Sequence, residues 1–340
     1  MAAYIVRRVL LMITLLFVLS MAVFVLFNML PGDPARLTCG KSCTPIVIEQ
    51  NRHRLGYDLP PHEQYIKFVS GLFFGRTFSE NSPEPIVCEA PCLGYSYNRH
   101  EEVLSLIVRS APVTFWLAIG AFILWIAVGV SLGIFAALRR GRWPDRLVLG
   151  VSLIGYSLPS FFFGLVLVFF VIIKWQWLPF PSYPTGANPG ETLTAPFRDP
   201  IAFLQTMILP WIVLAILYAA FYMRLTRNQV LEVFNDDFVR TARAKGLPER
   251  TVVVKHALRA GLTPIVTAAG LDLAGLLGGA IISESIFSLP GLGALSVDSI
   301  TNSDLPLITG ITLVTASLII VANFVVDLLY AVIDPRVRLV

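Results

Sequence analysis

Six long apolar segments constrain the fold of this chain more than any other feature of its sequence. About 20 residues of helix are needed to cross the roughly 30 Å hydrocarbon core of a membrane. Only 14% of the residues are charged, whereas soluble domains carry roughly a quarter. The sequence therefore predicts an all-α polytopic membrane protein with six transmembrane helices, near Val9–Leu30, Pro112–Leu138, Leu147–Ile173, Met207–Met223, Thr263–Ile282 and Leu307–Ile333.

Lysine and arginine are distributed unequally between the two sides that these segments define. Sixteen lie on one side, whereas the short loops of the other side, residues 174–206 and 283–306, contain only Lys174 and Arg198. Because cytoplasmic loops carry the excess of positive charge, we expect both termini to be cytoplasmic. The first apolar run is too long for a cleaved signal peptide and lacks a small-x-small site, so it is expected to remain as a helix. The net charge of +4 reflects this inner rim and indicates no nucleic-acid partner.

The predicted organisation has three parts: a first transmembrane helix over residues 1–30, a small extracytoplasmic subdomain over 31–111, and a five-helix core over 112–340. Two amphipathic helices, Pro45–Leu55 and Pro61–Leu72, are expected in the subdomain, followed by turn-rich chain up to Tyr97.

The subdomain contains all four cysteines of the chain. Disulfides are the usual state of cysteines outside the cytoplasm, and three connectivities are open, with pairing inside each short loop favoured over cross-linking of the two. The x3 spacing without a histidine cluster argues against a metal site, so none is expected at Cys39, Cys43, Cys88 and Cys92.

A polar island over about residues 224–261 separates the fourth and fifth apolar segments. It holds eight of the 26 lysines and arginines. Residues from Val239 to Lys245 are compatible with helix, Gly246 can adopt a left-handed stop, and Pro248 can open a second helix. A compact basic helix–turn–helix between membrane helices predicts docking of a soluble partner, with an ordinary solvated loop as the alternative.

A few polar residues lie inside the apolar segments. An intramembrane carboxylate such as Asp272 is expected to face a polar cavity or a partner, so substrate contact and a structural hydrogen bond both remain open. Asp327 lies near the inner end of its segment and is expected to pair with a loop arginine. Pro159 and Pro210 are expected to kink their helices. The residues predicted to line a translocation path are Asp272, Tyr156, Tyr218 and Asn28.

Other short motifs are less decisive. The spacings Gly129–x3–Gly133 and Gly275–x3–Gly279 allow close helix packing, either within one subunit or between subunits. A formal phosphate-loop match, Ala35–x4–Gly40-Lys41-Ser42, lacks the strand-to-helix context that such a loop needs. We therefore expect no catalytic residues in the chain.

At the polar island the sequence resembles the EAA loop of ABC-importer permeases, in the form found in the dipeptide/oligopeptide/nickel group. The run Arg-Thr-Ala-Arg-Ala-Lys-Gly, residues 240–246, carries the resemblance, although only Ala242 keeps the general acidic-Ala-Ala consensus. Further matches of the B-type subunit are MLPGDPARL from Met29, LGYS from Leu93, SLPSFFFGL from Ser157 and ESIFSLPGLG from Glu284. Together they touch nearly the whole chain.

The resemblance implies a type I importer permease fold in the bacterial cytoplasmic membrane. It implies a non-catalytic subunit that translocates di- or oligopeptides with a second homologous permease, two cytoplasmic ATPase domains and an extracytoplasmic substrate-binding protein. No cofactor is expected in this chain, because ATP and Mg would bind the partner ATPase subunits. The residues expected to couple the chain to the ATPase are Asp237, Arg240, Thr241, Ala242, Arg243, Ala244, Lys245, Gly246 and His256.

Two points stay open beside this resemblance. The same group also imports nickel and other non-peptide solutes, and an ion-driven secondary transporter is a separate class, although no inverted pair of broken helices is visible. The segment around Arg76–Cys92 also resembles an insertion, and we hypothesise that the two cysteine pairs brace an enlarged docking surface for a binding protein.

Overall fold

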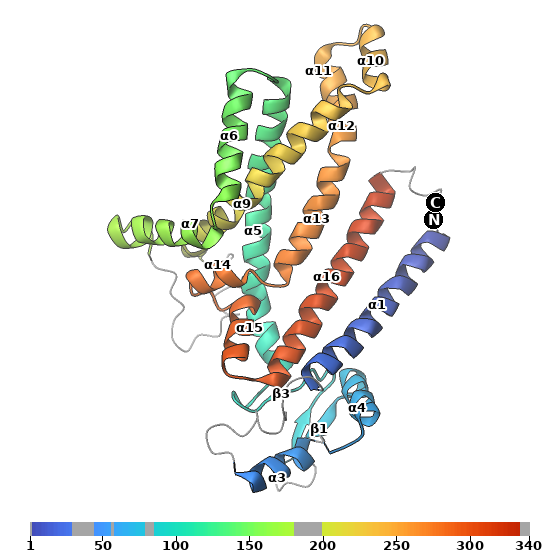
Figure 1. Cartoon of the computed structure of the whole chain (residues 1–340), viewed down its shortest axis with the longest axis vertical. Helices are drawn as coiled ribbons and strands as arrows, with labels where there is room; N and C mark the ends of the chain where they lie inside the picture. Colours follow the sequence, from blue (N-terminus) through green and yellow to red (C-terminus); the bar gives the residue numbers. More distant parts are fainter. Residues whose placement is uncertain (1, 29–43, 56–57, 79–84, 180–198, 334–340) are drawn as a thin grey trace.

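Long helices run side by side between two differently built ends (Figure 1). The computed structural model describes residues 2–28, 44–55, 58–78, 85–179 and 199–333. One end carries a small subdomain, and the other carries a short helical element that joins α9 (Pro200–Val233) to α13 (Thr263–Leu277).

Four helices are long and apolar enough to cross a membrane on their own: α1 (Ala2–Asn28), α5 (Val103–Leu138), α9 (Pro200–Val233) and α16 (Leu305–Ile333). Two bent pairs bring the number of candidate spans among the described residues to six. The first pair is α6 (Trp143–Ser157) with α7 (Ser160–Leu167), which continues as π-helical turns in η1 (Val168–Lys174). The second joins α11 (Glu249–Thr251), η3 (Val252–Ala257) and α12 (Leu258–Gly261) to α13 (Thr263–Leu277).

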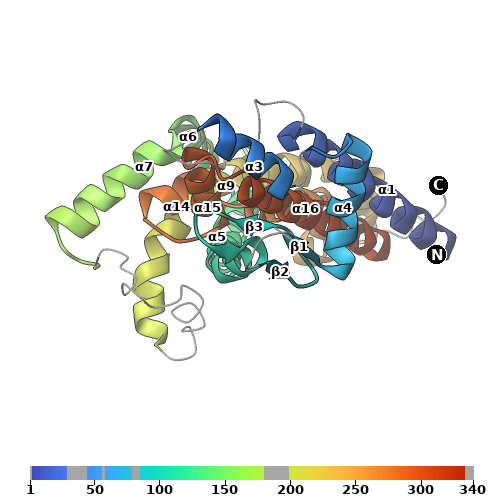
Figure 2. The ribbon, with the colours of Figure 1, turned by 90° about the horizontal axis from the view of Figure 1, so that it is seen from below.

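The third predicted span is not one straight helix. Its two halves meet at 94°, so that α7 leaves the bundle sideways (Figure 2). Leu158 is extended, because a residue before proline is disfavoured in helix, and Pro159 caps the start of α7. The expected kink at Pro159 is thus a full break.

The fourth span is longer than predicted at both ends. Helix α9 covers Pro200–Val233 without interruption, with Pro210 inside it. The first ten residues of the polar island, Arg224–Val233, are therefore the end of this helix. Asp199 accepts a hydrogen bond from the Ala202 backbone N–H at 3.1 Å and caps the start of α9.

The centre of the bundle is the packed pair α5 and α9. A Cβ added at Gly129 would lie 2.8 Å from Tyr222 Cβ, and one at Gly133 would lie 2.6 Å from Thr226 Cβ. The Gly129–x3–Gly133 motif therefore packs helices within this chain. A Cβ at Gly275 would meet nothing within 4 Å.

The subdomain combines helices with two small β-hairpins. Helix α3 (Pro45–Leu55) has the predicted bounds, and α4 (Pro61–Phe74) is two residues longer than predicted. Strand β1 (Arg76–Phe78) pairs with β2 (Ile86–Cys88), and β3 (Tyr95–Ser96) pairs with β4 (Glu101–Glu102), all antiparallel. The turn-rich stretch thus contains short strands that an all-α prediction omitted.

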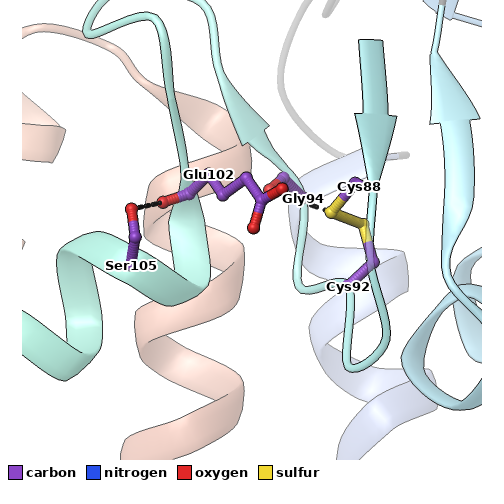
Figure 3. The surroundings of a disulfide bond; sticks show 5 residues. All are labelled: Cys88, Cys92, Gly94, Glu102 and Ser105. Carbon is purple, nitrogen blue, oxygen red and sulfur yellow. Dashed lines mark hydrogen bonds between the residues drawn. A yellow bond between two sulfur atoms is a disulfide. The ribbon is translucent and has the colours of Figure 1, made fainter.

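A disulfide closes the short loop after β2 (Figure 3). It joins Cys88 to Cys92, and both side chains are buried. Cys39 and Cys43 lie outside the described residues. Nearby, Ser105 Oγ donates to the Glu102 carbonyl at 2.8 Å at the start of α5. The predicted boundary at residues 111/112 falls inside α5, because Pro112 lies within that helix.

Contacts with the last third of the chain hold the subdomain against the bundle. Phe68 of α4, Val103 of α5 and Leu307 of α16 belong to one buried cluster. Ser96 Oγ donates to the Asp304 carboxylate, and the Arg99 guanidinium donates to the Asp298 carboxylate. Arg8, near the start of α1, and Asp327, near the end of α16, lie 2.6 Å apart. Asp327 therefore pairs with an arginine, but this arginine lies in a helix and not in a loop as expected.

Candidate functional site

The element between α9 and α13 presents a short helix to solvent. Helix α10 (Asp237–Ala244) ends at Lys245, and Gly246 follows with a φ of +73°. This left-handed conformation is one that glycine adopts without strain. Pro248 then caps α11, so the expected helix–glycine–proline–helix arrangement is present. We call residues 237–261, which contain the residues predicted to couple the chain to an ATPase, the coupling element.

A small core of its own makes the coupling element rigid. Val239 and Ala242 of α10 are buried against Val233, Val252 and Ala257. Arg243 donates to both oxygens of Glu249 across the glycine turn, at 2.6 and 3.2 Å. These hydrogen bonds raise the pKa of the Arg243 guanidinium, so it stays charged at any physiological pH. Bidentate pairs of this kind fix geometry as well as charge.

The predicted coupling residues divide between an exposed face and this core. Ala242 is buried and His256, in η3, is half-buried. The exposed members are Asp237, Arg240, Thr241, Arg243, Ala244, Lys245 and Gly246. An exposed polar surface on a firmly packed short helix is suited to contact with a soluble partner.

A buried ion pair braces the helix that leads into the coupling element. Arg227 on α9 donates to both carboxylate oxygens of Asp145 on α6, at 2.6 and 2.9 Å. Asp145 also accepts from the Gly141 backbone N–H at 2.9 Å. Its side chain is 3% exposed and that of Arg227 is 17% exposed. The two residues are 82 positions apart, so no local pattern indicates this pair.

A cavity of about 590 Å³ opens where α6 breaks into α7. Three of the residues expected to line a path, Tyr156, Tyr218 and Asp272, lie around it together, although they come from α6, α9 and α13. The side chain of Asn28, the last residue of α1, lies outside the described residues. The remaining lining residues are Ser157, Leu158, Pro159, Ser160, Leu217 and Phe221.

The break itself supplies polar groups to the cavity. Leu158 and Pro159 are the non-helical residues at the bend, and they line the cavity together with the hydroxyl-bearing Ser157 and Ser160 on either side. Within a membrane, irregular backbone is tolerated where it is buried in protein or lines a water-filled cavity. The SLPSFFFGL motif therefore builds one wall of this cavity.

Asp272 is oriented by a tyrosine from the opposite helix. Tyr222 on α9 donates its hydroxyl to Asp272 Oδ2 at 2.6 Å. Tyr218, one turn earlier, stacks on the buried ring of Trp125 with the ring centroids 4.5 Å apart. The structural hydrogen bond that the sequence left open thus exists, and Asp272 still faces the cavity.

Arg224 lies beside this cavity, in contact with one of its lining residues, and was not among the predicted path residues. Its guanidinium lies over the ring of Tyr156, 4.9 Å from the centroid. It follows the cavity residues Leu217 and Phe221 on the same face of α9, at helical spacings of seven and three. Arg224 was not predicted as a site residue because it begins a polar island that contains eight lysines and arginines, most of which are expected to be solvated.

Glu284 is a second such residue, and it joins three helices. It lies on α14 (Ile281–Ile286), is fully buried, and accepts from Thr114 Oγ1 at 2.8 Å and from the Ala294 N–H at 2.9 Å. Thr114, on α5, in turn accepts from the Leu292 N–H at 2.8 Å. Because Leu292 and Ala294 open α15 (Leu292–Thr301), the carboxylate caps that helix. A Cβ on Gly291 would lie 2.5 Å from Glu284 Cδ, which explains the ESIFSLPGLG spacing.

Among the described residues, no group of three or more His, Cys, Asp or Glu could hold a metal ion. The site consists of a largely apolar cavity with a few polar side chains among membrane helices, and of an exposed element at one end of two of those helices. This combination defines a membrane transport permease.

Comparison with known proteins gives the family. The chain belongs to the binding-protein-dependent transport system inner membrane components, whose family description matches residues 129–339; the description of the N-terminal part of such membrane components matches residues 1–118. It is an ABC importer permease subunit.

Two relatives match over nearly their full lengths. A probable peptide ABC transporter permease protein of Sinorhizobium fredii is 35% identical over 99% of this chain and 100% of its own length. The glutathione transport system permease protein GsiC of Escherichia coli (strain CFT073) is 37% identical over 98% of each chain. A chain of the MetNI methionine ABC transporter, solved in inward-facing conformations, covers 68% of this chain and 97% of its own with a TM-score of 0.51. At 17% identity, that similarity concerns the fold.

Proposed function

We propose that this permease subunit carries di- or oligopeptides across the bacterial cytoplasmic membrane, driven by ATP hydrolysis in partner subunits. The printed names of its relatives, which mention peptide and glutathione transport, support this substrate class. Their similarity extends over almost the whole chain, so the cavity region is included as well as the coupling element.

The observation that carries the proposal is the construction of the coupling element. Helix α10 exposes Arg240 and Lys245 while Val239 and Ala242 fix it to a buried core. A rigid helix of this kind can transmit a rigid-body motion. In the proposed arrangement it docks on a cytoplasmic ATPase, which places both chain termini in the cytoplasm and the α3–α4 subdomain outside.

The complete importer needs further subunits. It comprises this chain, a second homologous permease, two ATPase domains that bind ATP and Mg, and an external substrate-binding protein that delivers peptide to the subdomain. This chain holds no catalytic group in the proposal. The cavity lined by Tyr156, Tyr218 and Asp272 is part of the translocation path.

Co-purification tests the proposal directly. Tagged chain is isolated from native membranes in a mild detergent, and its partners are identified by mass spectrometry and by ATP hydrolysis in the eluate. Nucleotide-binding subunits, a second permease and hydrolysis are expected. Recovery of the chain alone in several detergents contradicts the proposal and favours a secondary transporter.

A charge-reversed pair of variants localises the ATPase contact. Arg240→Glu changes an exposed residue of α10, and Lys67→Glu changes an exposed residue of α4 at the other end of the molecule. The first variant should lose the ATPase on purification and the second should retain it. Equal retention by both variants contradicts docking through α10.

A further inference from the structure

We infer that the cavity at the α6–α7 break binds a zwitterion, with Asp272 pairing with an ammonium group and Arg224 pairing with a carboxylate of the same solute. This inference rests on the proposed function and specifies the chemistry of its substrate. A short peptide with free amino and carboxyl ends is the matching class of ligand.

Asp272 has one carboxylate oxygen available to a cation. Tyr222 occupies Oδ2, and Asp272 is only half-buried at the cavity wall. In the described part of the chain it forms no ion pair, whereas Asp145 pairs with Arg227 and Asp327 with Arg8. A carboxylate within a membrane is costly without a partner. A solute ammonium group entering the cavity supplies that partner.

Arg224 provides the opposite charge from a different helix. Its guanidinium is positioned by the ring of Tyr156, which itself lines the cavity. In the described structure the Arg224 side chain forms no ion pair, and this cation–π contact leaves its planar donors free for a carboxylate. The Arg224 guanidinium thus lies beside the cavity, against a ring that forms part of its wall, and a solute carboxylate reaches it at the edge of that ring.

The pair of charges also discriminates between solutes. A ligand with only one charged end leaves the second group desolvated and unpaired, and unpaired buried groups are the usual source of rejection. A bare metal cation could engage Asp272 but would be repelled by Arg224. A cavity of about 590 Å³ is within the range of small-molecule sites, so it has room for a short peptide.

Direct binding to the assembled importer tests this assignment. The purified permease–ATPase complex, without nucleotide and without the external binding protein, is placed in nanodiscs and titrated with alanyl-alanine, N-acetyl-alanyl-alanine and alanyl-alanine amide. Loss of one charge-assisted hydrogen-bonded contact should weaken binding about tenfold or more. The two blocked probes should therefore bind about tenfold more weakly than alanyl-alanine.

Variants assign each end of the peptide to its residue. Asp272→Asn should weaken alanyl-alanine about tenfold and leave the affinity for the N-acetyl probe unchanged. Arg224→Gln should weaken alanyl-alanine by a similar factor and leave the affinity for the amide probe unchanged. Asp272→Glu, which keeps the charge, should retain most of the discrimination against the N-acetyl probe. Asp199→Asn, the same change at the start of α9 away from the cavity, is the control and should alter no affinity.

Three results would overturn the inference. These are the absence of saturable alanyl-alanine binding by the wild-type complex, equal affinity for all three probes, or an Asp272→Asn effect of equal size on every probe, which indicates a structural role alone. ATP hydrolysis by the same wild-type nanodiscs separates this failure from a failure of the proposed function. Hydrolysis without probe discrimination contradicts the zwitterion site only, whereas a preparation that retains no ATPase contradicts the proposed function.

Discussion

The carboxylate of Glu284 allows a quantitative test of how α5, α14 and α15 are held together. Glu284 Oε1 accepts from Thr114 Oγ1 at 2.8 Å and from the Ala280 N–H at 3.2 Å, and Oε2 accepts from the Ala294 N–H at 2.9 Å. All three groups donate, so the site is built for a group that only accepts.

Glu284→Gln replaces one accepting oxygen with an amide NH2 group of nearly the same shape. The donors that faced this oxygen then meet another donor. Because the amide takes the orientation that loses the fewest hydrogen bonds, its oxygen keeps the Thr114 and Ala280 donors, and the Ala294 N–H loses its acceptor, at about 1–3 kcal/mol. Removal of a buried charge offsets part of this cost. We therefore expect a net loss of unfolding free energy near the low end of this range, about 1 kcal/mol.

Thermal unfolding of the purified complex in detergent measures the effect. Glu284→Gln should lower the unfolding temperature by a few degrees, and Glu89→Gln, the same change at an exposed position, should not. Gly291→Ala tests the same network from the other side, because its Cβ would lie 2.5 Å from Glu284 Cδ. If Glu284→Gln and Gly291→Ala both have the same unfolding temperature as Glu89→Gln and the wild type, the capping argument is wrong.

Three further predictions concern the helices that carry the site. Gly246→Ala should lower the free energy of unfolding by about 1–2 kcal/mol, because alanine is strained in the left-handed conformation, and it should reduce substrate-stimulated ATP hydrolysis. Gly246→Asn should lower both quantities less. Equal activity of the two variants would show that this conformation is irrelevant to coupling. Asp145→Asn should destabilise the chain by about 3 kcal/mol, because it leaves Arg227 largely buried without its partner, and adding Arg227→Gln should restore part of the loss; a thermal shift no larger than that of an exposed substitution argues against the brace. Gly133→Ala should cost about 1–3 kcal/mol through overpacking against α9, whereas Gly150→Ala, where a Cβ meets nothing within 4 Å, should be neutral or stabilising; similar unfolding temperatures would contradict the packing of α5 on α9.

Local rules predicted the parts of the fold that depend on local physics. The start of α3 follows from a proline that can open a helix, and Gly246 takes the left-handed conformation that the helix–glycine–proline pattern requires. Six apolar segments correspond to six candidate spans, provided that each bent pair is counted as one. Hydropathy is sufficient here because the length of an apolar run is set by the thickness of the membrane.

The direction of the helices could not be predicted in the same way. Side chains that face lipid and side chains that face other helices are both apolar, so composition does not distinguish a straight span from one broken by 94° at Pro159. Whether a proline kinks or breaks a helix depends on whether neighbouring groups satisfy the freed backbone. The helix α9, by contrast, continues through Pro210.

Contacts between residues far apart in the chain could not be predicted from the sequence either. Glu284 and Thr114 are 170 positions apart, and Arg227 and Asp145 are 82 apart. Each polar residue taken singly resembles an ordinary loop charge or a helix-interior hydroxyl. Asp272 was predicted because a carboxylate inside an apolar segment is conspicuous. Arg224 was missed because it directly follows the apolar segment Met207–Met223, where an arginine is an ordinary loop residue.

Two helices connect the coupling element to the walls of the cavity: α9 precedes the element in the chain, and α13 follows it. Helix α9 carries Phe221 and Arg224 and ends at Val233, whose side chain belongs to the core of the coupling element. From Phe221 to Val233 is twelve residues of uninterrupted helix, or roughly 18 Å. On the other side, the coupling element ends in α12, and α12 leads into α13, which carries Asp272. In the proposed importer, a push on α10 by the ATPase is therefore applied to both helices at once. Arg224 lies on α9 and Asp272 on α13, so any change in the angle between these helices changes the separation of the two charges. The motion that reorients the cavity therefore also alters its fit to a zwitterion.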